Sequence, residues 1–171
     1  HFELSPMYHN IILIRLLDCI YLSDLNKFSS KYYKVPYFRS IASKMCSWLE
    51  QITFSDGNIP LLNDSANGVV PHSNIILNYA RMLNLKWDEI KLLDSGYRRV
   101  NTDFFELLLD IGDIGPSYQP GHGHADTFNF ELYVNQLPCI VDTGVSTYTK
   151  GNLREIERST SSHNTVVVNN K

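Results

Sequence analysis

Hydrophobic positions recur at helical spacing through the first half of the chain. Ser5 followed by Pro6 fits an N-cap and a proline at the first helical position. The apolar residues that then follow one helical face are Met7, Ile11, Ile14, Leu17 and Tyr21. The same pattern predicts helices from Pro36 to about Thr53 and from Ser73 to Leu85, and a shorter helical piece near Trp87 to Leu93.

Beyond residue 94 the pattern changes to short runs rich in β-branched and aromatic residues, separated by turn residues. The predicted strands are Tyr97–Val100, Phe104–Ile111, Phe128–Val134, Cys139–Val141 and Asn164–Val168. Helices first and strands afterwards are typical of an α+β arrangement. We therefore expect a helical part over residues 1–94 and a β part over residues 95–171.

Composition limits the function classes. The 171 residues are 43% hydrophobic, which is enough to bury a core, and their net charge of -3 argues against non-specific nucleic-acid binding. The longest apolar run, Ile11 to Leu17, is interrupted by Arg15 and is too short to span a bilayer. Four arginines either pair with carboxylate or sulfate groups or are solvated: Arg98, Arg99, Arg154 and Arg158. We expect neither a nucleic-acid nor a membrane partner, and the oligomeric state stays open.

The stretch Gly121-His122-Gly123-His124-Ala125-Asp126 holds two imidazoles and a carboxylate just before a predicted strand. In an extended backbone, residues two apart point to the same face, so His122 and His124 are able to converge on one ion or one substrate. The alternative is a polar loop whose histidines are solvated.

A metal-binding set is available in the β part. His124, Asp142 and His163 supply two imidazoles and one carboxylate, which suit tetrahedral Zn²⁺ with water or substrate as the fourth ligand. The three residues lie far apart in the sequence, so their spacing alone is only weakly specific for a metal site. Asp142 is equally interpretable as a turn residue, and His163 as a hydrogen-bonded strand histidine.

Tyr8 falls in the first turn of the first predicted helix, a position that can face a cleft. A tyrosine there exchanges protons if nearby cations lower its pKa from about 10. The alternative is a tyrosine packed on a neighbouring helix.

Five stretches of the chain stand out together and follow one another in a fixed order. They are Phe2–His9, Asp56–Asp64, Gly112–Pro116 running into Gly121–Asp126, Val141–Gly144 and Arg158–Thr165. With these stretches the chain resembles the heparinase II/III family of polysaccharide lyases, whose relatives include heparinases and alginate lyases. The resemblance covers most of the chain. It implies the last helices of an α/α toroid over residues 1–94 and the first strands of an antiparallel, metal-binding β-sandwich over residues 95–171.

The resemblance also implies roles for individual residues. Tyr8 matches the family's catalytic tyrosine and His122 its active-site histidine. The implied ligands of a divalent metal, zinc being the first choice, are His124, Asp142 and His163. His9 is a second candidate for proton transfer or substrate binding. The implied reaction is β-elimination on an acidic, uronate-containing polysaccharide, in a periplasmic or secreted enzyme.

The chain starts at His1 without a methionine and stops after a β-like run, so we expect a fragment of a longer polypeptide. The family's neutralising asparagine or histidine lies upstream of the tyrosine motif, so the fragment alone is expected to be inactive. Two alternatives remain open. One is a carbohydrate-binding or assembly module with a structural metal and no turnover, and the other is a metal-dependent hydrolase.

Overall fold

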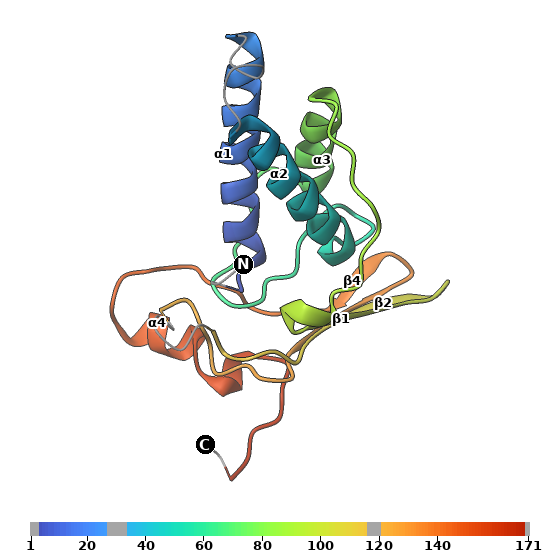
Figure 1. Ribbon diagram of the computed structural model, residues 1–171. Coiled ribbons are helices and arrows are strands. Elements are labelled where there is room, and N and C mark those ends of the chain that lie inside the picture. Colours follow the sequence, from blue (N-terminus) through green and yellow to red (C-terminus); the bar gives the residue numbers. More distant parts are fainter. Residues whose placement is uncertain (1–3, 27–33, 116–120, 170–171) are drawn as a thin grey trace.

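Helices and strands occupy separate parts of the fold. The computed structural model describes residues 4–26, 34–115 and 121–169. Three long helices lie together at one end and a four-stranded antiparallel sheet at the other (Figure 1). The α+β class predicted from the sequence is confirmed. Phe2, Glu3 and Pro116 of the family-like stretches lie outside the described residues.

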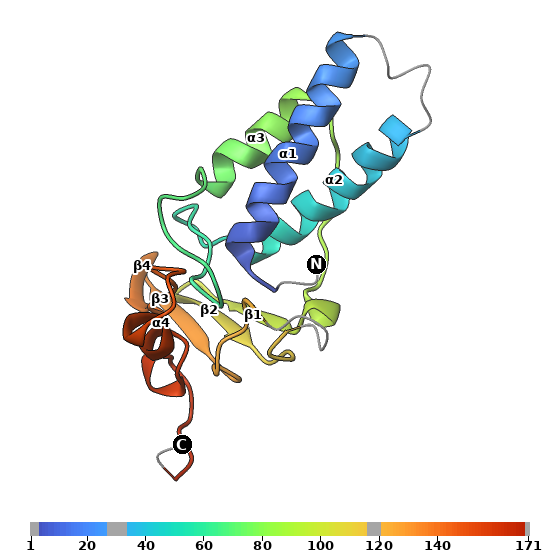
Figure 2. The ribbon, with the colours of Figure 1, turned by 90° about the vertical axis from the view of Figure 1, so that its left-hand side faces the viewer.

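The first helix, α1 (Pro6–Leu25), begins where the sequence predicts. The Ser5 hydroxyl caps it by accepting a hydrogen bond from the Tyr8 backbone N–H at 3.3 Å. Helices α2 (Lys34–Ile52) and α3 (Ser73–Met82) pack against α1 and against each other (Figure 2). None of the helices in the described ranges is long and apolar enough to cross a membrane.

The helical core consists of side chains that are almost completely buried between the three helices. They are Leu13, Leu17, Ile20, Ala42, Cys46, Leu49, Ile52, Ile76, Leu77 and Ala80. Full burial of one leucine or isoleucine side chain contributes about 1.5–3 kcal/mol. This packing therefore fixes the start of α1, which carries Tyr8.

The sheet runs in chain order and every neighbouring pair of strands is antiparallel. Its strands are β1 (Tyr97–Asn101), β2 (Phe105–Asp110), β3 (Phe130–Val134) and β4 (Leu137–Ile140). Burial alternates along β2, where Glu106, Leu108 and Asp110 are buried. A two-residue turn, Asn135 and Gln136 at φ 51° and 65°, joins β3 to β4 with the left-handed backbone that such hairpins need.

The sheet meets the helical part through the segment between α2 and α3. The Phe54 ring stacks on the Tyr133 ring of β3, with centroids 3.9 Å apart. The Leu61 backbone N–H donates to the buried Glu131 carboxyl at 2.6 Å, and the Ser55 N–H donates to Glu106 at 3.1 Å. These contacts hold residues 54–65 against β2 and β3.

The helical piece predicted near Trp87 to Leu93 is wrong. The chain leaves α3 through Asn84, whose φ is 57°, and residues 85–92 form no regular element. Buried Leu85 and Leu92 anchor this stretch, and the Trp87 indole N–H donates to Glu50 at 3.0 Å. Only a short 3₁₀ turn, Leu93–Ser95, precedes β1. Tertiary contacts override the local helical spacing here.

The strand predicted over Asn164–Val168 is also wrong. In the part of the chain that the structure describes, no strand pairs with these residues, and Val166 and Val168 are 74% and 63% exposed. A β-branched run needs a partner strand for its backbone hydrogen bonds. Before this segment the chain instead forms a short helix, α4 (Asn152–Glu157), and a 3₁₀ turn, Thr160–Ser162, next to the sheet.

Candidate active site

Tyr8 is held in place by the contacts of the helix cap. The Ser5 hydroxyl donates to the Asp64 carbonyl at 2.8 Å and lies 3.2 Å from the Ser65 hydroxyl. The Ser65 hydroxyl in turn accepts from the Met7 backbone N–H at 3.3 Å. The first turn of α1 is therefore fastened to residues 64 and 65, and Tyr8 projects beside that loop.

Tyr8 and His122 lie ring to ring. Their centroids are 4.7 Å apart and the ring planes are tilted by 50°. His122 keeps 28% of its side chain exposed, and Tyr8 is half-buried. The two residues that the sequence nominated for catalysis are thus brought together, with a route to solvent.

A buried carboxylate, Asp64, lies behind this pair. Asp64 Oδ2 is 2.7 Å from His122 Nδ1, and Asp64 Oδ1 is 2.9 Å from His124 Nε2. The Arg154 guanidinium donates from Nη2 to Asp64 Oδ2 at 2.8 Å, and its Nη1 lies 2.6 Å from Oδ1 as part of the same ion pair. Burial alone would raise the pKa of Asp64, but the hydrogen bonds from His124, Arg154 and His122 outweigh it and lower this pKa to about 2. Asp64 is therefore ionised at neutral pH.

Tyr148 completes what we name the tyrosine–histidine cluster, formed by Tyr8, Asp64, His122, Tyr148 and Arg154. The Tyr8 hydroxyl donates to the Tyr148 hydroxyl at 3.2 Å, and the Arg154 guanidinium lies 5.3 Å from the Tyr148 ring centroid. Burial of the phenol raises the pKa of Tyr148, and the negative charge of nearby Asp64 adds to this increase. The cluster places two phenols, an imidazole and a guanidinium at one surface.

Sequence reasoning gave no role to Asp64 or Tyr148. Asp64 stood in a family-like stretch, and Arg154 was one of four arginines proposed as anion partners. Nothing in the local pattern marks Tyr148, because its partners Tyr8 and Arg154 come from other elements.

Four more titratable side chains form a second group, the histidine–carboxylate cluster. Its members are His124, Asp126, Asp142 and His163, each at most 8% exposed. His163 Nδ1 is 2.8 Å from Asp142 Oδ2, which also accepts from the Asn129 amide at 2.6 Å. The rings of His124 and His163 are 5.1 Å apart. The three residues nominated as metal ligands therefore lie in one buried region.

Some donor atoms of this cluster are of the type that binds metals and are buried. His124 Nδ1, His163 Nε2 and Asp126 Oδ2 are buried and have no hydrogen-bond partner within the protein. Both oxygens of Asp142 accept hydrogen bonds, Oδ1 from the Gly144 backbone N–H at 2.8 Å. Within residues 4–26, 34–115 and 121–169, no three His, Cys, Asp or Glu side chains are grouped so that they could hold a metal ion. Imidazole nitrogens are therefore available in this buried region, but the described side chains are not arranged as a ready-made metal site.

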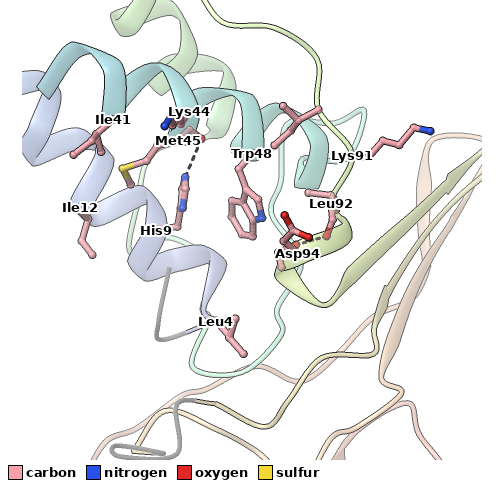
Figure 3. Close-up of a pocket in the computed structure, with 12 residues that line it drawn as sticks. Leu4, His9, Ile12, Ile41, Lys44, Met45, Trp48, Lys91, Leu92 and Asp94 are labelled. Carbon is pink, nitrogen blue, oxygen red and sulfur yellow. Dashed lines mark hydrogen bonds between the residues drawn. The ribbon is translucent and has the colours of Figure 1, made fainter. Parts of the chain in front are cut away.

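His9 faces α2 and not the side of α1 that carries Tyr8. Its Nε2 is 2.9 Å from the Met45 carbonyl, and its ring lies 4.3 Å from the Trp48 ring on α2. Figure 3 shows it in the wall of an apolar cavity of about 670 Å³ between α1, α2 and residues 90–95. Burial lowers the pKa of His9 to about 4, so the imidazole is neutral at pH 7. The structure does not bring His9 into the tyrosine–histidine cluster.

The β part of the chain matches a known family. Residues 84–171, just over half of the chain, match the family described as "Heparinase II/III-like, C-terminal". The chain therefore belongs to the heparinase II/III-like family, as its resemblance implied. No curated protein matches the chain.

Solved structures share the fold over the whole chain. A structure described as "Heparinase III-BT4657 gene product" superposes with a TM-score of 0.78 at 22% identity. The heparan sulfate lyase HepC from Pedobacter heparinus superposes with a TM-score of 0.74 at 20% identity. Each match covers 100% of this chain but 30% of the other chain, so the present sequence spans less than a third of these proteins. At 20–22% sequence identity, these similarities show that the chain shares its fold with the two structures.

Proposed function

We propose that the parent protein is a lyase that cleaves an acidic, uronate-containing polysaccharide by β-elimination. The observation that carries this proposal is the contact between Tyr8 and His122, whose ring centroids are 4.7 Å apart in front of Asp64 and Arg154. Membership of the heparinase II/III-like family supports it, as does the naming of two structural neighbours as heparinase III and heparan sulfate lyase.

The reaction needs proton transfer and charge stabilisation at the same sugar. The C5–H bond of the uronate breaks, its electron pair forms the C4–C5 double bond, and the C4–O bond to the next sugar breaks. A base takes the C5 proton, and an acid gives a proton to the departing oxygen. Negative charge accumulates next to a carboxylate that is already charged, so a donor to that carboxylate lowers the barrier.

Tyr8 is the proposed proton-transfer residue, as base, acid or both, and His122 the proposed donor to the uronate carboxylate. The family's further neutralising asparagine or histidine comes from sequence upstream of this chain, so the chain alone is expected to have no activity. His9, buried against α2, retains at most a role in substrate binding through the adjoining cavity.

Glycosaminoglycan, alginate and bacterial exopolysaccharide all carry the required uronates. A periplasmic or secreted location is proposed with them, because such polymers lie outside the cytoplasm. For the parent protein we propose the architecture of the family. The helices would be the last helices of an α/α toroid, and the sheet would be the beginning of an antiparallel β-sandwich.

A divalent metal, with zinc as first choice, is proposed for the histidine–carboxylate cluster. His124, Asp142 and His163 would hold it, and the buried nitrogens His124 Nδ1 and His163 Nε2 support this assignment. Binding would replace hydrogen bonds such as that between His163 and Asp142. When bound, the ion would brace the loop before β3 that carries His122.

The metal proposal is tested by elemental analysis of the purified parent protein. We expect about one zinc per chain, and we expect both His124→Ala and His163→Ala to lose it and to unfold at a lower temperature. His72→Ala, which removes an exposed histidine at the start of α3, is the matched control and should keep the zinc. Zinc bound equally by all variants would contradict the ligand assignment.

The reaction class is tested by incubating the full-length protein with uronate polymers and analysing the chain ends. Unsaturated ends support the lyase. Saturated ends would identify a hydrolase, and binding without cleavage would identify a carbohydrate-binding module; either result overturns the proposal.

A further inference from the structure

One carboxylate, Asp64, contacts both histidines that the proposed function uses in different ways. It lies between His122 of the tyrosine–histidine cluster and His124 of the histidine–carboxylate cluster, at 2.7 and 2.9 Å. Its side chain is completely buried, and Arg154 binds both of its oxygens. A paired buried carboxylate of this kind stays ionised.

An ionised carboxylate accepts hydrogen bonds and donates none, so each imidazole must present an N–H to Asp64. His122 therefore carries a proton on Nδ1, and its Nε2 must take up a second proton before the ring can donate to a sugar carboxylate. His124 carries its proton on Nε2 and leaves a lone pair on Nδ1. That nitrogen is the buried, unpartnered atom of His124.

We infer that Asp64 is a positioning residue that fixes the tautomers of His122 and His124 together. It directs Nε2 of His122 toward the substrate side and Nδ1 of His124 toward the proposed metal. The roles given to the two histidines rest on the proposed lyase activity. The position of the proton on each ring rests only on the contacts with Asp64. A carboxylate that orients a ligating or catalytic histidine in this way typically contributes about 10–100-fold to activity or metal affinity.

The proposed positioning role of the Asp64 side chain can be separated from a purely structural role. The loop contacts around Asp64 use backbone atoms, since the Ser5 hydroxyl donates to the Asp64 carbonyl and the Val145 N–H to the Ser65 carbonyl. Asp64→Asn keeps those contacts and the side-chain volume. Its amide has one accepting oxygen and one donating nitrogen, so it can no longer accept from both histidines.

Glu106→Gln is the matched control. Glu106 is also a buried carboxylate, and it accepts from the Arg99 guanidinium at 2.8 Å and from the Ser55 backbone N–H. Its hydrogen bonds include none from a histidine. The two variants therefore each remove a buried negative charge next to an arginine, and only Asp64→Asn disturbs imidazoles.

The experiment compares both variants in the full-length protein by kinetics and by ¹⁵N NMR of selectively labelled histidines. We expect Asp64→Asn to lower kcat by about 10–100-fold with little change in KM, and to weaken zinc binding by a similar factor. Glu106→Gln should leave both within about twofold, because Glu106 hydrogen-bonds to Arg99 and Ser55 and to neither histidine. In the wild type, the ring shifts should show the proton on Nδ1 of His122 and on Nε2 of His124.

The inference is overturned if either histidine has the opposite tautomer, or if Asp64→Asn and Glu106→Gln behave alike in kinetics and zinc binding. Failure of the lyase proposal looks different, since the wild type would then release no unsaturated product while the NMR signature of the two histidines would still be readable.

Discussion

Two neighbouring residues of α1, Tyr8 and His9, face different surroundings. Successive helical residues are rotated by about 100°, so Tyr8 meets His122 while His9 turns toward α2. Burial keeps the His9 ring neutral at pH 7, although the hydrogen bond to the Met45 carbonyl opposes this shift. Its low pKa is therefore a property of helix packing and not of the candidate active site.

The low pKa of His9 predicts that the folded protein loses stability in mild acid. Its pKa is about 4 in the folded protein and near 6.5 in the unfolded chain, so the unfolded state binds more protons between these values. The stabilisation is complete above about pH 6.5 and is lost as the pH falls toward 4, by at most about 3.5 kcal/mol at 1.4 kcal/mol per pKa unit. Urea unfolding at pH 7 and pH 4.5 should show a smaller difference for His9→Gln than for the wild type.

His72→Gln, at an exposed position, is the control for this measurement and should retain the wild-type difference. An unchanged pH dependence in His9→Gln would show that His9 does not titrate as the packing requires.

At the scale of elements, close contact between two loops sets the position of Asp64. Gly144 lies in the left-handed region at φ 62°, and a Cβ atom there would be 2.3 Å from the Ser65 carbonyl oxygen. The Val145 N–H donates to that same carbonyl at 2.9 Å. Only glycine permits this approach, so the Val141–Gly144 stretch braces the loop that carries Asp64.

Gly144→Ala is therefore expected to destabilise the fold by about 1–3 kcal/mol, through overpacking and backbone strain. The measurement is the free energy of unfolding in urea. Gly151→Ala is the matched control, because its added Cβ meets nothing within 4 Å and its φ of 162° is ordinary extended backbone. Equal stabilities of the two variants would contradict the bracing role of Gly144.

The elements that sequence patterns predicted correctly are those with local signals. The Ser5–Pro6 cap gave the start of α1, and aromatic and β-branched runs gave four strands. Errors occurred where distant contacts decide the backbone. Leu85 and Leu92 are buried without forming a helix between them, and Val166 to Val168 have no strand to pair with in the described structure.

At the scale of the whole molecule, the candidate site is assembled from the start of α1, the loop before α3, the loop before β3 and helix α4. Tyr8, Asp64, His122 and Arg154 come from these four places. Resemblance to the family nominated Tyr8 and His122, but their contact and the central position of Asp64 depend on tertiary packing. Side-chain pairing of this kind leaves no periodic signal in the sequence.

The chain spans about 30% of the length of the two solved structures compared above, so the proposed activity is assigned to the parent protein. The most direct measurement of the central claim is ultraviolet detection of unsaturated uronate released by the full-length protein. The wild type should release it, whereas Tyr8→Phe and His122→Ala should each abolish it. Tyr37→Phe and His72→Ala, at exposed positions, should retain it. Release at the wild-type rate by Tyr8→Phe or His122→Ala would contradict the account.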